Sequence, residues 1–173
     1  MAKYIIDTDS GTCTPFTNST TAAPKGARMV EILAAHRGDT EYNGFCATIQ
    51  KWYYGSVVKA AWCATTLSYL LHQVGISSHK QENVNNLRIS LKSDHYNGTY
   101  YEGKDIPKTI QKGDILFWLW SGSEMTNTSS KHVGLAEYDT NTDTIYCIGG
   151  NQKDKICTLA YNRKNLYAIY RLR

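Results

Sequence analysis

The sequence contains no apolar run long enough to span a membrane, and its first seven residues lack the apolar core of a signal peptide. We therefore expect synthesis in the cytoplasm without an export signal, and no membrane insertion. No block of Lys or Arg is present, and the net charge of +4 is spread along the chain. This charge pattern argues against nucleic acid as a partner and is compatible with an anionic polymer such as a cell wall.

Cysteine pairs and metal-binding spacings are also missing. The five cysteines form no Cys-x-x-Cys pair, and their odd number argues against a disulfide framework. Cys147 and Cys157 are equidistant from Gln152, so a simple hairpin would place them opposite each other as neighbouring thiols. Residues 7–11 (Asp-Thr-Asp-Ser-Gly) are similar to the start of a calcium loop, but its twelfth position is Asn18 instead of Glu. We expect no metal.

The composition is typical of one globular domain with a substantial core, at 42% hydrophobic and 20% charged residues over a length of 173. Residues 1–25 include a Thr/Ser-rich stretch with two prolines and indicate an N-terminal arm or linker. Residues 26–173 form the predicted domain. The 13 tyrosines and 4 tryptophans are a surplus of amphipathic rings, which is common on surfaces that bind polar polymers or peptides.

Helices are predicted first and strands afterwards. Apolar periodicity predicts helices over residues 28–37, 44–54 and 61–75, with a short one near 83–91 in an otherwise loop-like segment, 77–112. After residue 113 the pattern predicts five short strands, over residues 115–120, 131–138, 144–148, 155–159 and 166–171. This order indicates an α+β fold in which N-terminal helices pack on a roughly five-stranded antiparallel sheet.

The helix over residues 61–75 carries Cys63 in its first turn. Cys63 lies four residues before Leu67 and so shares the buried stripe, and Gly75 supplies a left-handed residue to end the helix. Unpaired backbone N–H groups and the helix dipole favour a thiolate at such a position. Cys63 is therefore either an activated nucleophile or a buried structural cysteine.

His132 is the candidate base. It opens a strand after a long polar loop, where catalytic groups often lie. It shares a strand face with Gly134 and Ala136, whose small side chains would let the Cys63 helix approach closely. A histidine near a thiol can take the thiol proton and later protonate a leaving amine. The alternative is a polar residue at the rim of the sheet.

Several ordered segments resemble one family. They are residues 51–55 (Lys-Trp-Tyr-Tyr-Gly), 61–64 (Ala-Trp-Cys-Ala), 113–117 (Gly-Asp-Ile-Leu-Phe), 131–135 (Lys-His-Val-Gly-Leu) and 148–152 (Ile-Gly-Gly-Asn-Gln). Their order and spacing are similar to the CHAP-type (cysteine, histidine-dependent amidohydrolase/peptidase) cell-wall hydrolases, especially those of phage endolysins. The resemblance covers roughly residues 27–173. It implies a papain-like fold and cleavage of amide bonds in peptidoglycan.

Catalytic roles follow from this resemblance by position. Cys63 matches the nucleophile and His132 the base, whereas Gly149 stands where the family commonly has a Glu. Asn151 is our candidate for orienting His132, and a hairpin-turn role is its alternative. Glu137 is the alternative carboxylate, but its odd offset from His132 points it to the opposite strand face.

Candidate substrate-binding residues are less specific. The backbone N–H of Cys63 would hold the oxyanion together with one further donor, for which Gln50, Tyr53 and Tyr54 remain open. Two tryptophans, Trp62 and Trp120, are candidates for lining the substrate groove, although tryptophan is more often a core residue.

The predicted function is that of a peptidoglycan hydrolase acting through a thioester without a cofactor. The bond cleaved is either the N-acetylmuramoyl–L-alanine amide or a stem or cross-bridge peptide bond. A phage pore-forming protein would be a partner for access to the wall. Two other classes stay open: a different papain-like cysteine protease, and a catalytically inactive cell-wall binding module.

Overall fold

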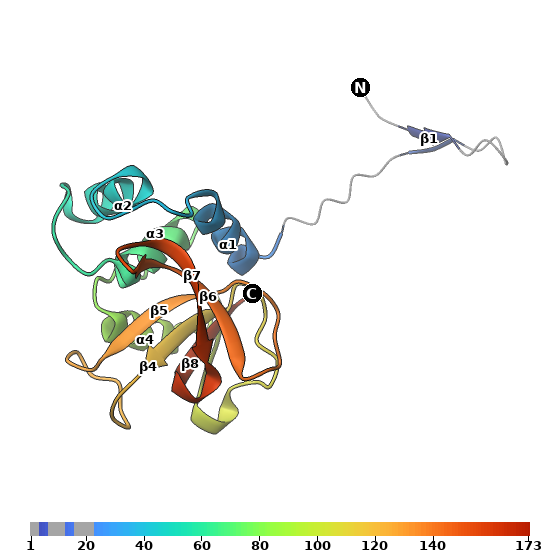
Figure 1. Cartoon of the computed structure of the whole chain (residues 1–173). Coiled ribbons are helices and arrows are strands. Elements are labelled where there is room, and N and C mark those ends of the chain that lie inside the picture. The colour runs from blue at the N-terminus through green and yellow to red at the C-terminus, as the bar shows by residue number, and fades with distance from the viewer. Residues whose placement is uncertain (1–3, 7–12, 16–22) are drawn as a thin grey trace.

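A computed structural model describes residues 4–6, 13–15 and 23–173 (Figure 1). Over residues 23–173 the chain forms four α-helices and a six-stranded antiparallel sheet, which confirms the α+β prediction. The helices are α1 (Lys25–Ala35), α2 (Gly44–Tyr54), α3 (Cys63–Gln73) and α4 (Val84–Lys92). The sheet contains β3 (Gly98–Glu102), β4 (Ile115–Leu119), β5 (Lys131–Ala136), β6 (Thr144–Gln152), β7 (Lys155–Asn162) and β8 (Leu166–Leu172).

Two short strands lie outside this sheet. β1 (Tyr4–Ile6) and β2 (Cys13–Pro15) pair with each other. Residues 7–11 and 18, which are similar to a calcium loop, lie outside the described residues. In the part of the chain that is described, no helix combines the length and apolar composition needed to cross a membrane.

The sheet has the strand order β3-β8-β4-β5-β6-β7. It has six strands where five were expected, because β3 forms within the segment predicted to be loops. β3 is an edge strand that pairs only with β8, and four of its five residues are half-buried. An edge strand covered on one side needs no regular apolar alternation, so its sequence gave a weak signal.

α3 is the central helix of the core, as Figure 1 shows. Its predicted stripe is confirmed, since Leu67, Leu70 and Leu71 are fully buried. Gly75 has a φ of +83°, and the N–H of the next residue donates to the carbonyl of Leu71, which is the expected helix-ending geometry. The sheet residues that share this core include Ile115, Phe117, Val133, Leu135 and Ile148.

The opposite sheet face forms a second core, and His132 belongs to this face. His132 pairs with Trp118, and Ala136 packs with Trp118 in the second cluster. α3 instead packs on the face of Val133 and Leu135. The expectation that α3 would approach the face of His132, Gly134 and Ala136 is therefore wrong. The larger side chains bury more apolar area under the helix, and a Cβ atom on Gly134 would lie 2.5 Å from Sγ of Cys147.

The β6–β7 hairpin contains a bulge. Lys153 and Asp154 form the turn, both with positive φ, and the register shifts between Gly149 and Gln152. Cys147 therefore pairs with Leu159, and Cys157 pairs with Gly149, so the predicted opposition of Cys147 and Cys157 is wrong. Both are free thiols. The turn lies at Lys153 and Asp154 instead of at Gln152, and this displaces the pairing that equal spacing about Gln152 predicts.

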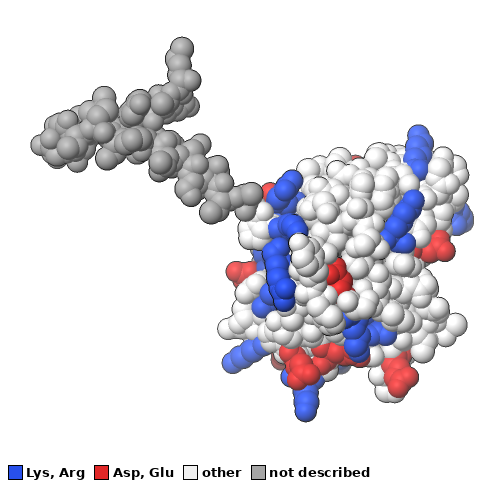
Figure 2. Space-filling model, turned by 180° about the vertical axis from the view of Figure 1, so that it is seen from behind, with Lys and Arg blue, Asp and Glu red and all other residues white. Residues whose placement is uncertain are grey.

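Charged residues are interspersed over the face of the molecule that Figure 2 shows. Lys and Arg side chains lie near Asp and Glu on a mostly uncharged surface, instead of gathering in one large patch. The arrangement agrees with the scattered charge pattern of the sequence.

Candidate active site

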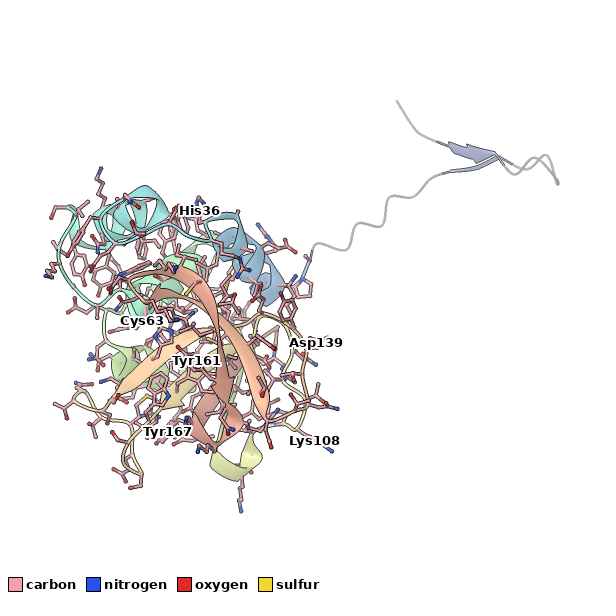
Figure 3. The ribbon with its side chains drawn as sticks, in the orientation of Figure 1. His36, Cys63, Lys108, Asp139, Tyr161 and Tyr167 are labelled. Atoms are coloured by element: carbon pink, nitrogen blue, oxygen red, sulfur yellow. The ribbon has the colours of Figure 1, made fainter. Side chains whose placement is uncertain are left out.

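Cys63 is the first residue of α3 and lines a pocket of about 260 Å³. Its neighbours come from the start of α4 on one side and from the end of the β4–β5 loop on the other; the lining residues are Ala61, Glu82, Asn83, Val84, Asn127, Ser129 and Lys131. Figure 3 labels Cys63 where α3 begins. The side chain is 7% exposed, so this is a nearly buried thiol that borders a pocket.

The protonation of Cys63 is set by opposing effects. Burial raises the pKa of the thiol, while hydrogen bonds from the backbone N–H groups of Val133, Ala64 and Cys63 itself, and the charge of Lys131, act to lower it. Burial outweighs the others, so the resting thiol carries its proton at neutral pH. The backbone N–H groups at the helix start do lower the pKa, as expected, but the sequence argument left out the desolvation that opposes them. A reaction of this thiol at neutral pH would require a base.

His132 directly precedes Val133, whose backbone N–H lies near the Cys63 thiol. Pairing between β5 and β6 joins Leu135 to Ile148 and Ala136 to Cys147 and stops there, so Val133 lies beyond it. The Val133 N–H instead acts on the Cys63 thiol and lowers its pKa. The backbone at Val133 thus lies near the sulfur, while the His132 side chain belongs to the sheet face opposite the one that α3 covers. Among the described residues, no hydrogen bond joins the thiol to the ring of His132, and its Nε2 is buried without a partner.

Burial lowers the pKa of His132 to about 4. The imidazole is therefore neutral over the whole range in which most proteins are stable, and a neutral imidazole can accept a proton. A protonated thiol and an uncharged imidazole are the two groups that general-base activation of a nucleophile requires.

Two aromatic rings limit the orientation of this imidazole. The ring centroids of Trp120 and Tyr161 lie 6.4 and 6.3 Å from that of His132, and 5.4 Å from each other. The Tyr161 hydroxyl donates to Oε1 of Gln152 at 2.8 Å, and Nε2 of Gln152 donates to the carbonyl of Cys157 at 2.6 Å. The hairpin β6–β7 therefore holds Tyr161 against His132.

Tyr161 and Gln152 were missed by the sequence analysis. Gln152 stands at the end of the family-like segment 148–152, which was the one available signal. Tyr161 carried no signal, because its contact with His132 depends on the curvature and register of β7.

Gly149 lies beside the imidazole of His132. A Cβ atom on Gly149 would lie 3.1 Å from Nε2 of His132. Asn151 lies in the β6 bulge with a φ of +58°. Among the described residues Asn151 makes no hydrogen bond to His132, so its orienting role stays a prediction.

Glu137 is engaged elsewhere. Its buried carboxylate accepts hydrogen bonds from Arg37 at 2.5 Å and from Thr158 at 2.5 Å. Thr158 pairs with Ile148, on the face that packs against the helices, as the odd offset of Glu137 from His132 predicts. Glu137 therefore serves to join the α1–α2 connection to the sheet.

The other candidate residues are divided between core and surface. Gln50 is fully buried, its Oε1 accepts from the Val58 N–H at 3.1 Å, and its Nε2 is buried without a partner. Tyr54 reaches the pocket through a 2.8 Å hydrogen bond to Glu82, and Tyr53 packs on Tyr54. Gln50 thus fixes the loop that leads to Cys63, whereas Tyr54 supports the pocket rim.

The two tryptophans differ. Trp62 is fully buried, and a Cβ atom on Gly150 would lie 2.7 Å from its ring. The expectation that Trp62 lines the substrate groove is therefore wrong, because α3 and β6 close over it. Trp120 is 39% exposed beside His132 and remains available to a substrate.

A second cavity lies away from this site. It measures about 340 Å³ and is lined by residues that include Asp114, Asp139 and Arg171. Asp114 and Arg171 form an ion pair at 2.7 Å there. Figure 3 shows Asp139 distant from Cys63 in the view. No group of three or more His, Cys, Asp or Glu side chains suited to a metal occurs within the residues described.

Comparisons with protein-family models and with curated proteins found no match for this chain. Any assignment of function must therefore come from the site itself and from the family-like segments.

Proposed function

We propose that this protein is a peptidoglycan amidohydrolase with a papain-like fold, in which Cys63 is the nucleophile and His132 the base. One observation carries the proposal: Cys63 lines one pocket together with Lys131, the residue that directly precedes His132 in β5. The start of α3 therefore lies beside the start of β5, which supports a reaction that uses a thiol and an imidazole.

The chemistry follows from the two protonation states. Neutral His132 takes the Cys63 proton, and the sulfur attacks the carbonyl carbon of the scissile amide. The backbone N–H of Cys63 donates to the oxyanion. The intermediate collapses to a thioester while protonated His132 gives its proton to the leaving amine. Water activated by His132 then hydrolyses the thioester and restores the thiol.

Peptidoglycan is proposed as the substrate on the resemblance of the ordered segments around Cys63, His132 and Gly149 to cell-wall hydrolases. The exposed ring of Trp120 beside the imidazole supports a polymeric substrate, because such rings bind the apolar faces of extended ligands. In a phage setting a pore-forming protein would give access to the wall.

One observation favours a second candidate, a catalytically inactive wall-binding module. Nε2 of His132 has no partner, and the family's carboxylate is replaced by Gly149. A site that has lost its orienting group would keep the pocket and lose turnover.

Digestion of purified peptidoglycan, with mass spectrometry of the new termini, tests the proposal. The wild type should release fragments with one new amine per bond cleaved, and Cys63→Ala should release none while keeping its circular dichroism spectrum. Cys157→Ala is the matched control and should digest normally. Wall binding without new termini would favour the binding module, and cleavage of unfolded proteins in place of walls would favour another papain-like protease.

A further inference from the structure

The pocket that contains Cys63 has opposite charges on its two walls. Glu82, just before α4, lines one wall, and Lys131, at the start of β5, lines the other. The two charged groups form no ion pair with each other within the part of the chain that is described. Each charge is therefore left to act on what enters the pocket.

Lys131 is held in place by the fold. Its ammonium group donates to the carbonyls of Asn127 at 2.8 Å and Ser129 at 3.0 Å, which fixes it at the end of the β4–β5 loop. Lys131 lines the same pocket as Cys63, and its charge lowers the pKa of the thiol. Neutral carbonyls leave the positive charge uncompensated.

Glu82 is held from the opposite side. The Tyr54 hydroxyl donates to its carboxylate at 2.8 Å, and this hydrogen bond fixes the carboxylate without neutralising it. The exposed side chain of Lys80 instead lies over the rings of Trp52 and Tyr53, with its nitrogen 4.9 and 5.1 Å from their centroids. The negative charge of Glu82 therefore remains on the pocket rim.

We infer that this pocket binds a zwitterionic peptide, with an ammonium group toward Glu82 and a carboxylate toward Lys131 on the two sides of the amide at Cys63. The inference rests on the proposed function and narrows its substrate class to stem peptides with free amines and free carboxylates. Fixed opposite charges on facing walls also set the direction in which the peptide lies, since the reversed peptide would place like charges together.

The test compares muropeptides purified from walls with the same muropeptides after acetylation of their amines or amidation of their carboxylates. Each modification should lower the kcat/KM of the wild type about fivefold, mostly because KM rises. Glu82→Gln, which keeps the hydrogen bond to Tyr54, should cleave native and acetylated peptides at equal rates. Lys131→Met should do the same for native and amidated peptides. Glu31→Gln and Lys104→Met are matched controls on exposed surfaces and should discriminate as the wild type does.

Two results would overturn the inference: equal rates of the wild type on all three substrates, or discrimination that survives in Glu82→Gln. The substrate modifications need no variant, so they test the Lys131 wall even if Lys131→Met folds poorly.

A second readout separates this inference from the proposed function. If no muropeptide is cleaved at all, the proposed function fails, and the charges are then read from alkylation of Cys63. The rate of alkylation by each charged reagent is divided by the rate with neutral iodoacetamide. For the cationic reagent bromoethylammonium, this ratio should be lower in Glu82→Gln than in the wild type. For the anionic reagent iodoacetate, it should be lower in Lys131→Met than in the wild type. Unchanged ratios would overturn the charged-wall inference.

Discussion

The position of a Cβ atom on Gly149 lies 3.1 Å from Nε2 of His132 and 3.3 Å from Nε2 of Gln152. The fold therefore directs residue 149 at the imidazole, although glycine offers no side chain to bond it. The imidazole is instead held by Trp120 and Tyr161. Orientation by packing in place of a hydrogen bond is a property that substitutions can measure.

Gly149→Ala should lower turnover roughly tenfold with little loss of stability. Its methyl group would press on the imidazole, and displacements well under 1 Å are costly in catalysis. Gly150→Ala is the matched neighbour: its methyl group would meet Thr66 and the buried Trp62 ring, so it should cost about 1–3 kcal/mol of stability. Thermal unfolding and steady-state rates of both variants check this. Equal stability losses with no difference in turnover would contradict it.

Tyr161→Leu should lower turnover roughly tenfold, because it removes the ring that packs on His132. It should also move the acid limb of the pH profile toward the ordinary histidine value of 6.5, since the imidazole becomes less buried. Tyr161→Phe keeps the ring and loses only the bond to Gln152, so its profile should stay near the wild type. A Tyr161→Leu variant with the wild-type pH limb would show that the ring has no positioning role.

The role of Asn151 is tested with three variants, because its left-handed backbone must be separated from the effect of its side chain. Asn151→Gly preserves that conformation and removes the amide, whereas Asn151→Ala also adds about 1 kcal/mol of backbone strain. If the amide orients His132, both should lower turnover while retaining partial activity, and Asn151→Asp should keep more. Loss of activity in Asn151→Ala alone would assign the residue to the bulge and not to catalysis.

Glu137→Gln should reduce stability by about 1–3 kcal/mol and leave the turnover of folded protein unchanged, since its carboxylate is buried against Arg37 and Thr158. Hydrogen bonds from these partners outweigh burial and hold the pKa of Glu137 below its usual value. The carboxylate therefore stabilises the fold above the unfolded pKa, and this contribution is lost as pH falls through the folded value. Urea titrations of the wild type and Glu137→Gln at pH 7 and pH 3.5 check this. The difference between their free energies of unfolding should be smaller at pH 3.5 than at pH 7.

His132 should place the acid limb of kcat/KM well below 6.5. Burial lowers its pKa to about 4, so the base stays neutral and competent as pH falls through 6 and 5. The same shift makes the unfolded state bind a proton first, so stability also falls between pH 6.5 and 4. Rates on soluble muropeptides from pH 3.5 to 8, at a temperature where the protein stays folded, check this. An acid limb of the kcat/KM profile at or above pH 6.5 would show that the imidazole is solvated and its pKa is not lowered.

Local sequence patterns were sufficient to predict most of the helices and strands. α2 has its predicted bounds, and α3 ends at Gln73, two residues before the left-handed Gly75, because apolar periodicity and left-handed glycines act within a few residues. The order of helices before strands gave the fold class. The juxtaposition of Cys63 with β5 was predicted through the family-like segments more than through periodicity.

Long-range packing set what the sequence could not predict. The face of β5 that α3 covers depends on which side buries more area, so α3 was expected on the wrong face, that of His132. The bulge at Asn151 moved the β7 register by one residue and brought Tyr161 to the imidazole. The desolvation that keeps the Cys63 thiol protonated arises from segments far apart in the chain.

The position of β8 has a consequence for folding order. β8 lies between β3 and β4, and it is the only one of these three strands made after the hairpin β6–β7. Until residues 166–172 leave the ribosome, the wholly apolar β4 has one open edge and β3 has no neighbour in the sheet. Sheet assembly therefore waits for nearly the whole domain, and chains interrupted during translation should present β4 to chaperones and proteases instead of closing around Cys63.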